Sequence, residues 1–196
     1  MKFCSECGHP VELKITPDDE VPRFQCSHCH TIHYQNPKIL VSCYATWGDK
    51  VLWIKRGTAP NIGKWAAPSG FMEENETLTE AAARELYEET RARVDMSKMA
   101  LHMIGNLTAM NQVYMVFHAP LLSPQFSTTD EAIEVALFDS DEFPRSEFAF
   151  PDVVENVDLF YRDLQAQEFD VYMGALADGK NLVRRNRSTI ALPAKT

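Results

Sequence analysis

Carboxylates crowd one short stretch of the sequence, residues 70–90, which reads GFMEENETLTEAAARELYEET and holds seven glutamates. Most of them fall in one predicted helix, where like charges four residues apart destabilise by a few tenths of a kcal/mol per pair. Such crowding is unfavourable unless a cation lies among the acids. Carboxylate oxygens are hard ligands that suit Mg²⁺ or Mn²⁺. Periodicity alone leaves two readings open, a metal site and a merely acidic helix.

The helix itself has a clear predicted start. Thr77 and Glu80 form a capping box, so the helix begins near Leu78. Spacing the residues at about 100° places Leu78, Ala82 and Leu86 on one core-facing stripe. Acids border this stripe instead of lying opposite it, with small residues on the surface between them; the acids are Glu85, Glu88 and Glu89, and the small residues are Ala81 and Ala92.

Four of the five cysteines form two C-x2-C pairs with 18 residues between them. This spacing is typical of zinc ribbons, in which four thiolates make a closed tetrahedral site. Two disulfides or four free thiols are the alternatives, and the N-terminus MKFCSECGHP lacks the apolar stretch of a secretory signal that would favour disulfides. We predict one structural Zn²⁺ on Cys4, Cys7, Cys26 and Cys29. Nearby histidines could replace a ligand, but four cysteines already fill the shell; they are His9, His28, His30 and His33.

The elements that must position these groups follow from the pattern of the chain. Residues 1–35 are too short for a core of their own and depend on metal, and YQNPK (34–38) marks a boundary. The larger domain therefore spans 36–196. It contains a hairpin around Gly48-Asp49, in whose first strand Cys43 is expected to be buried. The other expected elements are a loop (58–70), strands (100–108, 112–119, 134–138 and within 168–176) and a helix from Pro151 to about 165. This mixture favours α+β or a mixed-sheet α/β sandwich.

Composition limits the class of partner. The 196 residues are 45% hydrophobic and 24% charged, as in ordinary globular proteins, and the net charge is −9. That charge gives no support to a nucleic-acid partner held through its phosphates, and a small anionic substrate would need a local cation. No apolar run approaches the roughly 18 residues of a membrane span. We expect a cytoplasmic protein with a small-molecule substrate and with neither a nucleic-acid nor a membrane partner.

The glutamate-rich stretch resembles the signature of the Nudix hydrolases, G-x5-E-x7-R-E-U-x-E-E-x-G-U, where U is aliphatic. Seven positions over 20 residues match: Gly70, Glu76, Arg84, Glu85, Leu86, Glu88 and Glu89. The sequence departs from the signature at its end, where Arg91 replaces the second glycine and Ala92 the final aliphatic residue. In the family that glycine ends the helix and does not touch metal.

The resemblance implies a Nudix α/β/α sandwich over residues 36–165 and cleavage of a nucleoside diphosphate linked to another moiety. It implies that Glu85, Glu88 and Glu89 bind Mg²⁺ or Mn²⁺ together with the carbonyl of Ser69. Glu76 and Arg84 would orient these ligands through ion pairs.

Two Nudix groups share an N-terminal zinc ribbon. Bacterial NADH pyrophosphatases carry an S-Q-P-W-P-F-P signature after the Nudix signature (residues 70–92 here, called the box below). At that place this chain has MIGNLTAMNQVYMVF. The sequence is more similar to the FAD and ADP-ribose pyrophosphatases of plant chloroplasts and bacteria. The similar segments are the two C-x2-C pairs, YQNPK, GKWAAPSGFME, QVYMVF and FDSDEFPRSEFAF. We therefore expect FAD or ADP-ribose as substrate, with release of AMP. NADH or a nucleoside triphosphate is the alternative.

Other residues are candidates for substrate binding, each with a structural alternative. Trp65 and Phe71 either stack on a flat ring or belong to the core. Arg56 and Lys55 end a strand expected to face the same cleft, where a cation could bind phosphate or remain solvated. Glu131 and Glu134 lie where many Nudix enzymes place a base or a further metal ligand, although an ordinary polar loop explains them equally well.

Three functional classes compete for this sequence. A dinucleotide pyrophosphatase explains the box, the ribbon and the negative charge, whereas a sanitising triphosphate hydrolase leaves the ribbon unexplained. A non-catalytic zinc-ribbon adaptor is the third class, disfavoured because every box carboxylate is present. Related enzymes are often homodimers, and no stretch of the sequence tests that.

Overall fold

The computed structural model describes residues 1–16, 19–177, 180–181 and 184–185. The chain divides into two compact units, Met1–Pro37 and a second unit that begins at Lys38. The first unit is a small antiparallel sheet in the order β1-β2-β3. Its strands are β1 (Val11–Lys14), β2 (Arg23–Cys26) and β3 (Ile32–His33).

The second unit is built around a mixed sheet with the strand order β10-β5-β4-β9-β8-β11-β12, and β6, β7 and β13 pair at its margins. Strand β4 runs parallel to β9, and β11 runs parallel to β8, whereas β8 and β9 are antiparallel. The strands are β4 (Lys38–Trp47), β5 (Lys50–Arg56), β6 (Trp65–Ala66), β7 (Ser69–Phe71), β8 (Ala100–Leu107), β9 (Gln112–Pro120), β10 (Ala132–Phe138), β11 (Tyr172–Ala177), β12 (Lys180–Asn181) and β13 (Arg184–Arg185).

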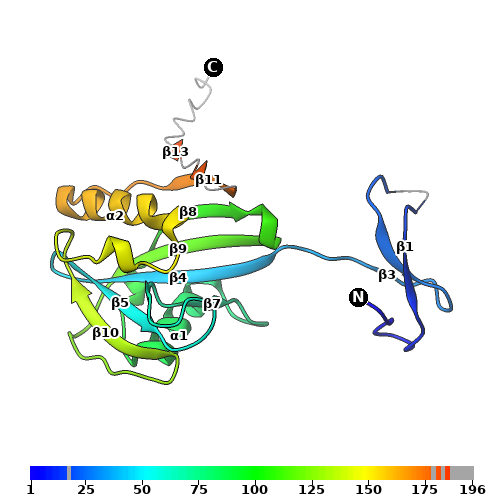
Figure 1. Cartoon of the computed structure of the whole chain (residues 1–196), viewed down its shortest axis with the longest axis horizontal. Coiled ribbons are helices and arrows are strands. Elements are labelled where there is room, and N and C mark those ends of the chain that lie inside the picture. The colour runs from blue at the N-terminus through cyan, green and yellow to red at the C-terminus, as the bar shows by residue number, and fades with distance from the viewer. Residues whose placement is uncertain (17–18, 178–179, 182–183, 186–196) are drawn as a thin grey trace, which may run out of the picture. The chain divides into compact units, whose positions relative to one another are not determined.

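Two helices cover opposite faces of this sheet, α1 (Leu78–Thr90) and α2 (Val154–Ala166) (Figure 1). Shorter 3-10 turns occur at Met96–Lys98, Thr108–Met110, Arg145–Glu147 and Pro151–Val153. The architecture confirms the expected mixed-sheet α/β/α sandwich. No helix of the described part of the chain is long and apolar enough to cross a membrane.

Local sequence signals placed most of these elements. Strands β4 and β5 form the predicted hairpin, and α1 starts at Leu78 with the Thr77–Glu80 capping box present. Pro151 opens a 3-10 turn, and α2 begins three residues later. The predicted loop at 58–70 is wrong in part, because β6 pairs with β5 and β7 pairs with β4 inside it. The end of the chain, beyond residue 185, lies outside the described residues.

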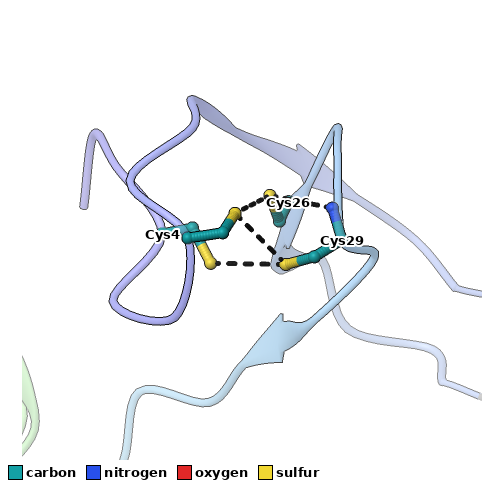
Figure 2. A group of neighbouring side chains, drawn as sticks. Cys4, Cys26 and Cys29 are labelled. Atoms are coloured by element: carbon teal, nitrogen blue, oxygen red, sulfur yellow. Dashed lines mark hydrogen bonds between the residues drawn. The ribbon is translucent and has the colours of Figure 1, made fainter.

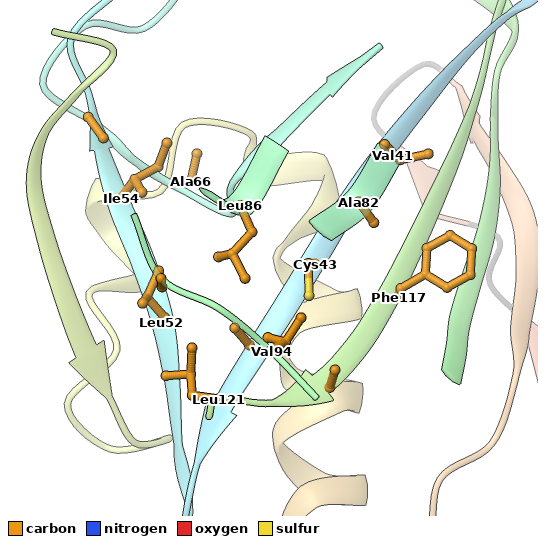
Figure 3. Close-up of a cluster of buried hydrophobic side chains, with 14 of the residues drawn as sticks. Val41, Cys43, Leu52, Ile54, Ala66, Ala82, Leu86, Val94, Phe117 and Leu121 are labelled. Atoms are coloured by element: carbon orange, nitrogen blue, oxygen red, sulfur yellow. The ribbon is translucent and has the colours of Figure 1, made fainter. Parts of the chain in front are cut away.

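The core between the sheet and α1 is made mostly of small and medium side chains, together with the ring of Phe117 (Figure 3). Alternate residues of β4 point into it, including Val41 and Cys43, which is buried as predicted. Leu86 of α1 is fully buried against them, and so is Ala81. The expectation that Ala81 and Ala92 lie on the surface is wrong, because the helix packs more deeply than its apolar stripe suggests. Small side chains allow this close approach.

The core between the sheet and α2 is aromatic. Tyr44, Trp53 and Phe160 are buried together there. The indole Nε1 of Trp53 donates to the Tyr161 hydroxyl at 2.9 Å, and that hydroxyl donates to the carbonyl of Phe138 at 2.8 Å. The polar groups of Trp53 and Tyr161 are therefore satisfied by hydrogen bonds.

Candidate functional site

Strand β7 brings the start of the Nudix-like box against α1. Ser69 pairs with Ser42 and Gly70 with Val41 of β4, so the strand is held by the central sheet. A Cβ atom on Gly70 would collide with the carboxylate of Glu85. Glycine at position 70 thus leaves the space that the Glu85 carboxylate occupies, and any larger residue there would displace this carboxylate.

Arg84 connects three carboxylates and the strand. Its Nε and Nη2 atoms donate to the two oxygens of Glu76 at 2.9 and 2.7 Å, a bidentate pair. Its Nη1 donates to Glu85 at 2.8 Å and to Glu88 at 3.1 Å, and its Nη2 reaches the carbonyl of Phe71 at 3.1 Å. The ion pairs that the resemblance implies are present, and Arg84 links them to strand β7.

Glu89 occupies the most enclosed position of the box. The residue is 7% exposed, and its carboxylate accepts a hydrogen bond from the backbone N–H of Ser69 at 3.0 Å. Burial raises the pKa of this carboxyl to about 8, and the charges of Glu85 and Glu131 add to the increase. In the part of the chain that the structure describes, Glu89 has no ion pair with a cationic side chain. A buried carboxylate in this position would be stabilised by a bound cation.

The other carboxylates have different environments. Burial raises the pKa of Glu85, while the neighbouring Arg84 opposes that change. The hydrogen bonds from Arg84 lower the pKa of Glu76 to about 2, so Glu76 remains ionised beside the guanidinium. The side chain of Glu88 is 55% exposed. The donor set is thus one enclosed, one half-enclosed and one exposed carboxylate, and all three offer hard oxygen ligands that fit Mg²⁺ or Mn²⁺.

Arg56 and Glu131 join the box from strand β5 and the loop before β10. The positive charge of Arg56 lowers the pKa of Glu89, and the negative charge of Glu131 raises it, so both lie near that carboxylate. Arg56 also donates to the carbonyl of Pro60 at 2.8 Å, and its guanidinium lies 5.6 Å from the centre of the Phe150 ring. Arg56 is therefore a cationic side chain close to the most enclosed carboxylate of the box.

Lys55 and Glu134 lie on the other face of the sheet. They form an ion pair at 2.9 Å, in the register of β5 and β10. The expectation that Lys55 faces the same cleft as Arg56 is wrong, because successive residues of a strand point to opposite faces. Glu134 lies beside Lys55 in strand β10, whereas Glu131 precedes this strand and lies near Glu89.

The loop that carries Glu131 is anchored directly to α1, a feature that the sequence pattern did not reveal. The hydroxyl of Thr129 donates to the carbonyl of Glu89 at 3.0 Å and accepts from the N–H of Ala132 at 3.1 Å. On the other side, the N–H of Gly57 donates to the carbonyl of Glu131 at 2.8 Å. A Cβ on Gly57 would collide with the carbonyl of Asp130, so the loop passes tightly over this glycine.

The two aromatic candidates differ in exposure. Trp65 is 4% exposed and packs edge-on against Phe138, with ring centres 4.8 Å apart. The amino group of Lys55 lies 5.3 Å from the centre of the Trp65 ring. This geometry favours the core alternative for Trp65. Phe71 is 43% exposed beside the box, and the amino group of Lys38 lies 5.2 Å from its ring centre. Phe71 is therefore the aromatic ring available to a planar group.

The helix ends where the sequence departs from the Nudix signature. Arg91 caps α1 in the left-handed conformation, with φ 59°, and its N–H donates to the carbonyl of Tyr87 at 2.8 Å. This conformation favours glycine, which explains the signature residue at this position. The arginine keeps the same backbone path, and its guanidinium lies 5.3 Å from the centre of the Tyr87 ring.

The cysteines of the first unit converge as the spacing predicts (Figure 2). The Sγ atoms of Cys4 and Cys29 are 3.6 Å apart, and Cys7 Sγ lies 3.4 Å from both Cys26 and Cys29 Sγ. All four ligand atoms lie within 4.8 Å of one another, which fits a tetrahedral zinc site. Among the described residues, the box carboxylates form no cluster as tight as this one.

Two hollows among the described residues of the second unit lie beside α2. One of 540 Å³ includes His118 and Phe169 in its lining, and one of 490 Å³ includes Arg162 and Tyr172. Neither contains a box residue. We nevertheless place the candidate site at the box, because buried carboxylates, a nearby cation and an exposed ring meet there.

Comparison with known proteins decides the family. Residues 37–160 match the model described as NUDIX domain, and residues 2–35 match the one described as Nudix N-terminal, a zinc ribbon. The chain belongs to the NUDIX family. The crystal structure of a NUDIX hydrolase from Nitrosomonas europaea is 43% identical, covers 89% of this chain and 98% of its own, and has a TM-score of 0.84. The structure titled UDP-X diphosphatase, at 23% identity and a TM-score of 0.57, supports the fold alone.

Curated relatives of this NUDIX chain carry two kinds of name. The NAD-capped RNA hydrolase NudC of Edwardsiella ictaluri is 36% identical over 47% of this chain and 34% of that protein. The ADP-ribose pyrophosphatase of Methanocaldococcus jannaschii is 26% identical over 63% of this chain and 74% of its own. The match thus spans about a third of the length of the NudC protein. These names leave the preference for FAD unsupported, and they bring back the NADH class that the missing signature had disfavoured.

Proposed function

We propose that this NUDIX chain hydrolyses the diphosphate bridge of a nucleoside diphosphate linked to another moiety, with ADP-ribose and FAD as the first candidates. The observation that carries this proposal is the Arg84 network, which holds Glu85 and Glu88 beside the buried carboxylate of Glu89. Three carboxylates gathered around one arginine and one backbone N–H form a site for a divalent cation. A bound Mg²⁺ or Mn²⁺ would neutralise the diphosphate and lower the pKa of a bound water.

In this proposal four side chains around the metal ligands have separate roles. Glu76 keeps Arg84 in place through the bidentate pair, and Arg84 in turn orients Glu85 and Glu88. Arg56 attracts the phosphate charge, which the overall net charge of −9 would otherwise repel. Glu131 would accept the proton that the attacking water loses as the P–O bond of the bridge breaks.

Phe71 supports a planar group on the substrate. Its ring is exposed beside the box, and Lys38 next to it adds a positive charge. A ring so placed can stack on adenine or flavin. Trp65 has no such role in this proposal, because it is buried.

A hydrolysis panel tests the proposal. The protein is mixed with Mg²⁺ or Mn²⁺ and with ADP-ribose, FAD, NADH or dGTP, and the products are separated by chromatography. We expect AMP together with ribose 5-phosphate from ADP-ribose or FMN from FAD. Cleavage of dGTP alone would indicate a triphosphate hydrolase, and the absence of cleavage with either metal would favour the non-catalytic adaptor.

A further arm tests the expectation that nucleic acid is not a partner. Free NAD and an RNA bearing NAD at its 5′ end are compared at equal concentration, because relatives are named NAD-capped RNA hydrolases. Equal or lower turnover of the RNA is expected, given the acidic chain. A strong preference for the RNA would overturn the small-molecule assignment but leave the box chemistry intact.

A further inference from the structure

Two histidines of the first unit, His9 and His28, lie on the two cysteine knuckles and stack on each other. Their ring centres are 3.9 Å apart, and the ring planes differ by 7°. Both residues are exposed, so the stack is not part of a core. The ligand atoms of Cys7, His9 and His28 lie within 4.8 Å of one another. One thiolate and two imidazoles are a donor set that suits a borderline transition metal such as Zn²⁺.

His9 makes a hydrogen bond of the kind that metal-bound imidazoles make. Its Nδ1 atom lies 3.1 Å from the carbonyl oxygen of Cys7. A carbonyl oxygen only accepts, so Nδ1 carries a proton in this hydrogen bond, and in the neutral ring Nε2 then carries the lone pair. Imidazoles that bind metals almost always donate their second nitrogen to such an acceptor, which fixes the tautomer and the ring.

The charge of the tetrathiolate centre favours a second cation at Cys7. Four thiolates around one Zn²⁺ leave a net charge of −2. Three of the thiolates have polar neighbours of their own. Cys4 Sγ lies 3.3 Å from Nε2 of His33, Cys26 Sγ accepts from the N–H of Cys29 at 3.4 Å, and Cys29 Sγ lies 3.2 Å from the hydroxyl of Thr31. The two stacked imidazoles lie beside Cys7. A metal-bound thiolate retains lone pairs, so Cys7 can bridge two ions.

We propose that Cys7, His9 and His28 form a second metal site on the surface of the ribbon, where a Zn²⁺ ion shares the Cys7 sulfur with the tetrathiolate zinc. Zn–S bonds of about 2.3 Å and Zn–N bonds of about 2.0–2.1 Å define such a site. Because an imidazole binds a metal in the plane of its ring, the two exposed rings would rotate out of their parallel stack to bind one ion. The site is open to solvent, and its ion exchanges more readily than the enclosed one.

Cobalt tests this site in the zinc-loaded full-length protein. Co²⁺ is added to protein that elemental analysis shows to hold one zinc per chain, and the absorption of the cobalt–thiolate charge transfer is recorded together with zinc release. We expect one further Co²⁺ with a thiolate band and no loss of zinc. The box glutamates contain no sulfur, so Co²⁺ bound there gives no such band.

Matched variants separate ligation from stacking. His9→Phe and His28→Phe keep an aromatic ring in the stack but remove the nitrogen, and each should weaken the thiolate-linked cobalt binding at least about tenfold. His30→Asn is the control, because His30 is exposed, lies outside the cluster and has a φ of 61° that asparagine tolerates. Absence of the band in the wild type, release of one zinc per cobalt bound, or an unchanged band in both Phe variants would each overturn the proposal.

Discussion

The two helices of the NUDIX unit have equal length, 13 residues each, and cover opposite faces of one sheet, yet they pack in different ways. Helix α1 approaches through Ala81, Ala82 and Leu86, whereas α2 approaches through large rings such as Phe160. The small side chains bring α1 close enough for Glu89 to reach the backbone of Ser69. The core of small side chains thus brings the box carboxylates against β7, and the aromatic core covers the other face of the same sheet.

The largest expected effect is a loss of stability caused by a substitution on the α2 face. Phe160→Ala removes a ring that lies 4.9 Å from Tyr44 and 5.0 Å from His102, measured between ring centres. It should lower the free energy of unfolding by about 3–5 kcal/mol, measured by urea denaturation. Phe160→Leu should lose less and keep the wild-type turnover per folded molecule. A fall in turnover with the Leu variant would show that the two faces do not divide their roles.

The next effect falls on the α1 face. Glu88→Gln or Glu89→Gln removes a carboxylate charge that a divalent cation needs, and turnover should fall by more than about a hundredfold. Glu155→Gln, on the exposed first turn of α2, is the control and should change turnover little. Wild-type rates in both box variants would mean that α1 is merely acidic.

The stability that Glu89 contributes should fall as the pH rises, whereas a carboxylate in an ordinary ion pair contributes more stability as the pH rises. The pKa of Glu89, about 8 in the folded state, lies above the usual carboxyl value, so the folded state holds more protons between about pH 4.5 and 8. Stability in chelator-containing buffer should therefore fall as the pH rises through this window. Glu89→Gln should flatten the decline and raise the melting temperature at pH 8. An identical decline in this variant would contradict the assignment.

A smaller effect is expected from the loop that meets α1. Thr129→Val removes the hydrogen bond to the Glu89 carbonyl and loosens the loop that carries Glu131. We expect kcat to fall roughly tenfold, with KM nearly unchanged, because Thr129 positions other groups. Thr129→Ser restores the hydroxyl and should restore kcat. A loss of kcat that Ser does not rescue would assign the effect to packing.

The smallest expected effect is a gain in stability from a substitution at the end of α1. Arg91→Gly relieves a left-handed residue and should raise the free energy of unfolding by roughly 0.5–1 kcal/mol. The gain is limited because the contact between Arg91 and the Tyr87 ring is lost. Arg91→Asn should lie between the two in its urea midpoint. Lower stability of the Gly variant would show that the ring contact outweighs the backbone strain.

The sequence by itself determined the features that depend on local spacing. The Thr77–Glu80 capping box set the start of α1, and helical periodicity put Leu86 in the core with acids beside it. The two C-x2-C pairs predicted the cysteine cluster, because each pair closes its own tight turn. Strand alternation around Gly48-Asp49 gave the hairpin, and the box residues by their order indicated the family.

Only the tertiary structure decided which of the candidate residues share a site. The pairing of β7 with β4 brought Gly70 close to Glu85, and the pairing of β10 with β5 placed Glu134 beside Lys55 and away from Glu89. Arg56 was parted from Lys55 because the residues of β5 alternate between the two faces. These outcomes depend on partners distant in the chain, and no local pattern of charge or hydrophobicity encodes which strands will meet.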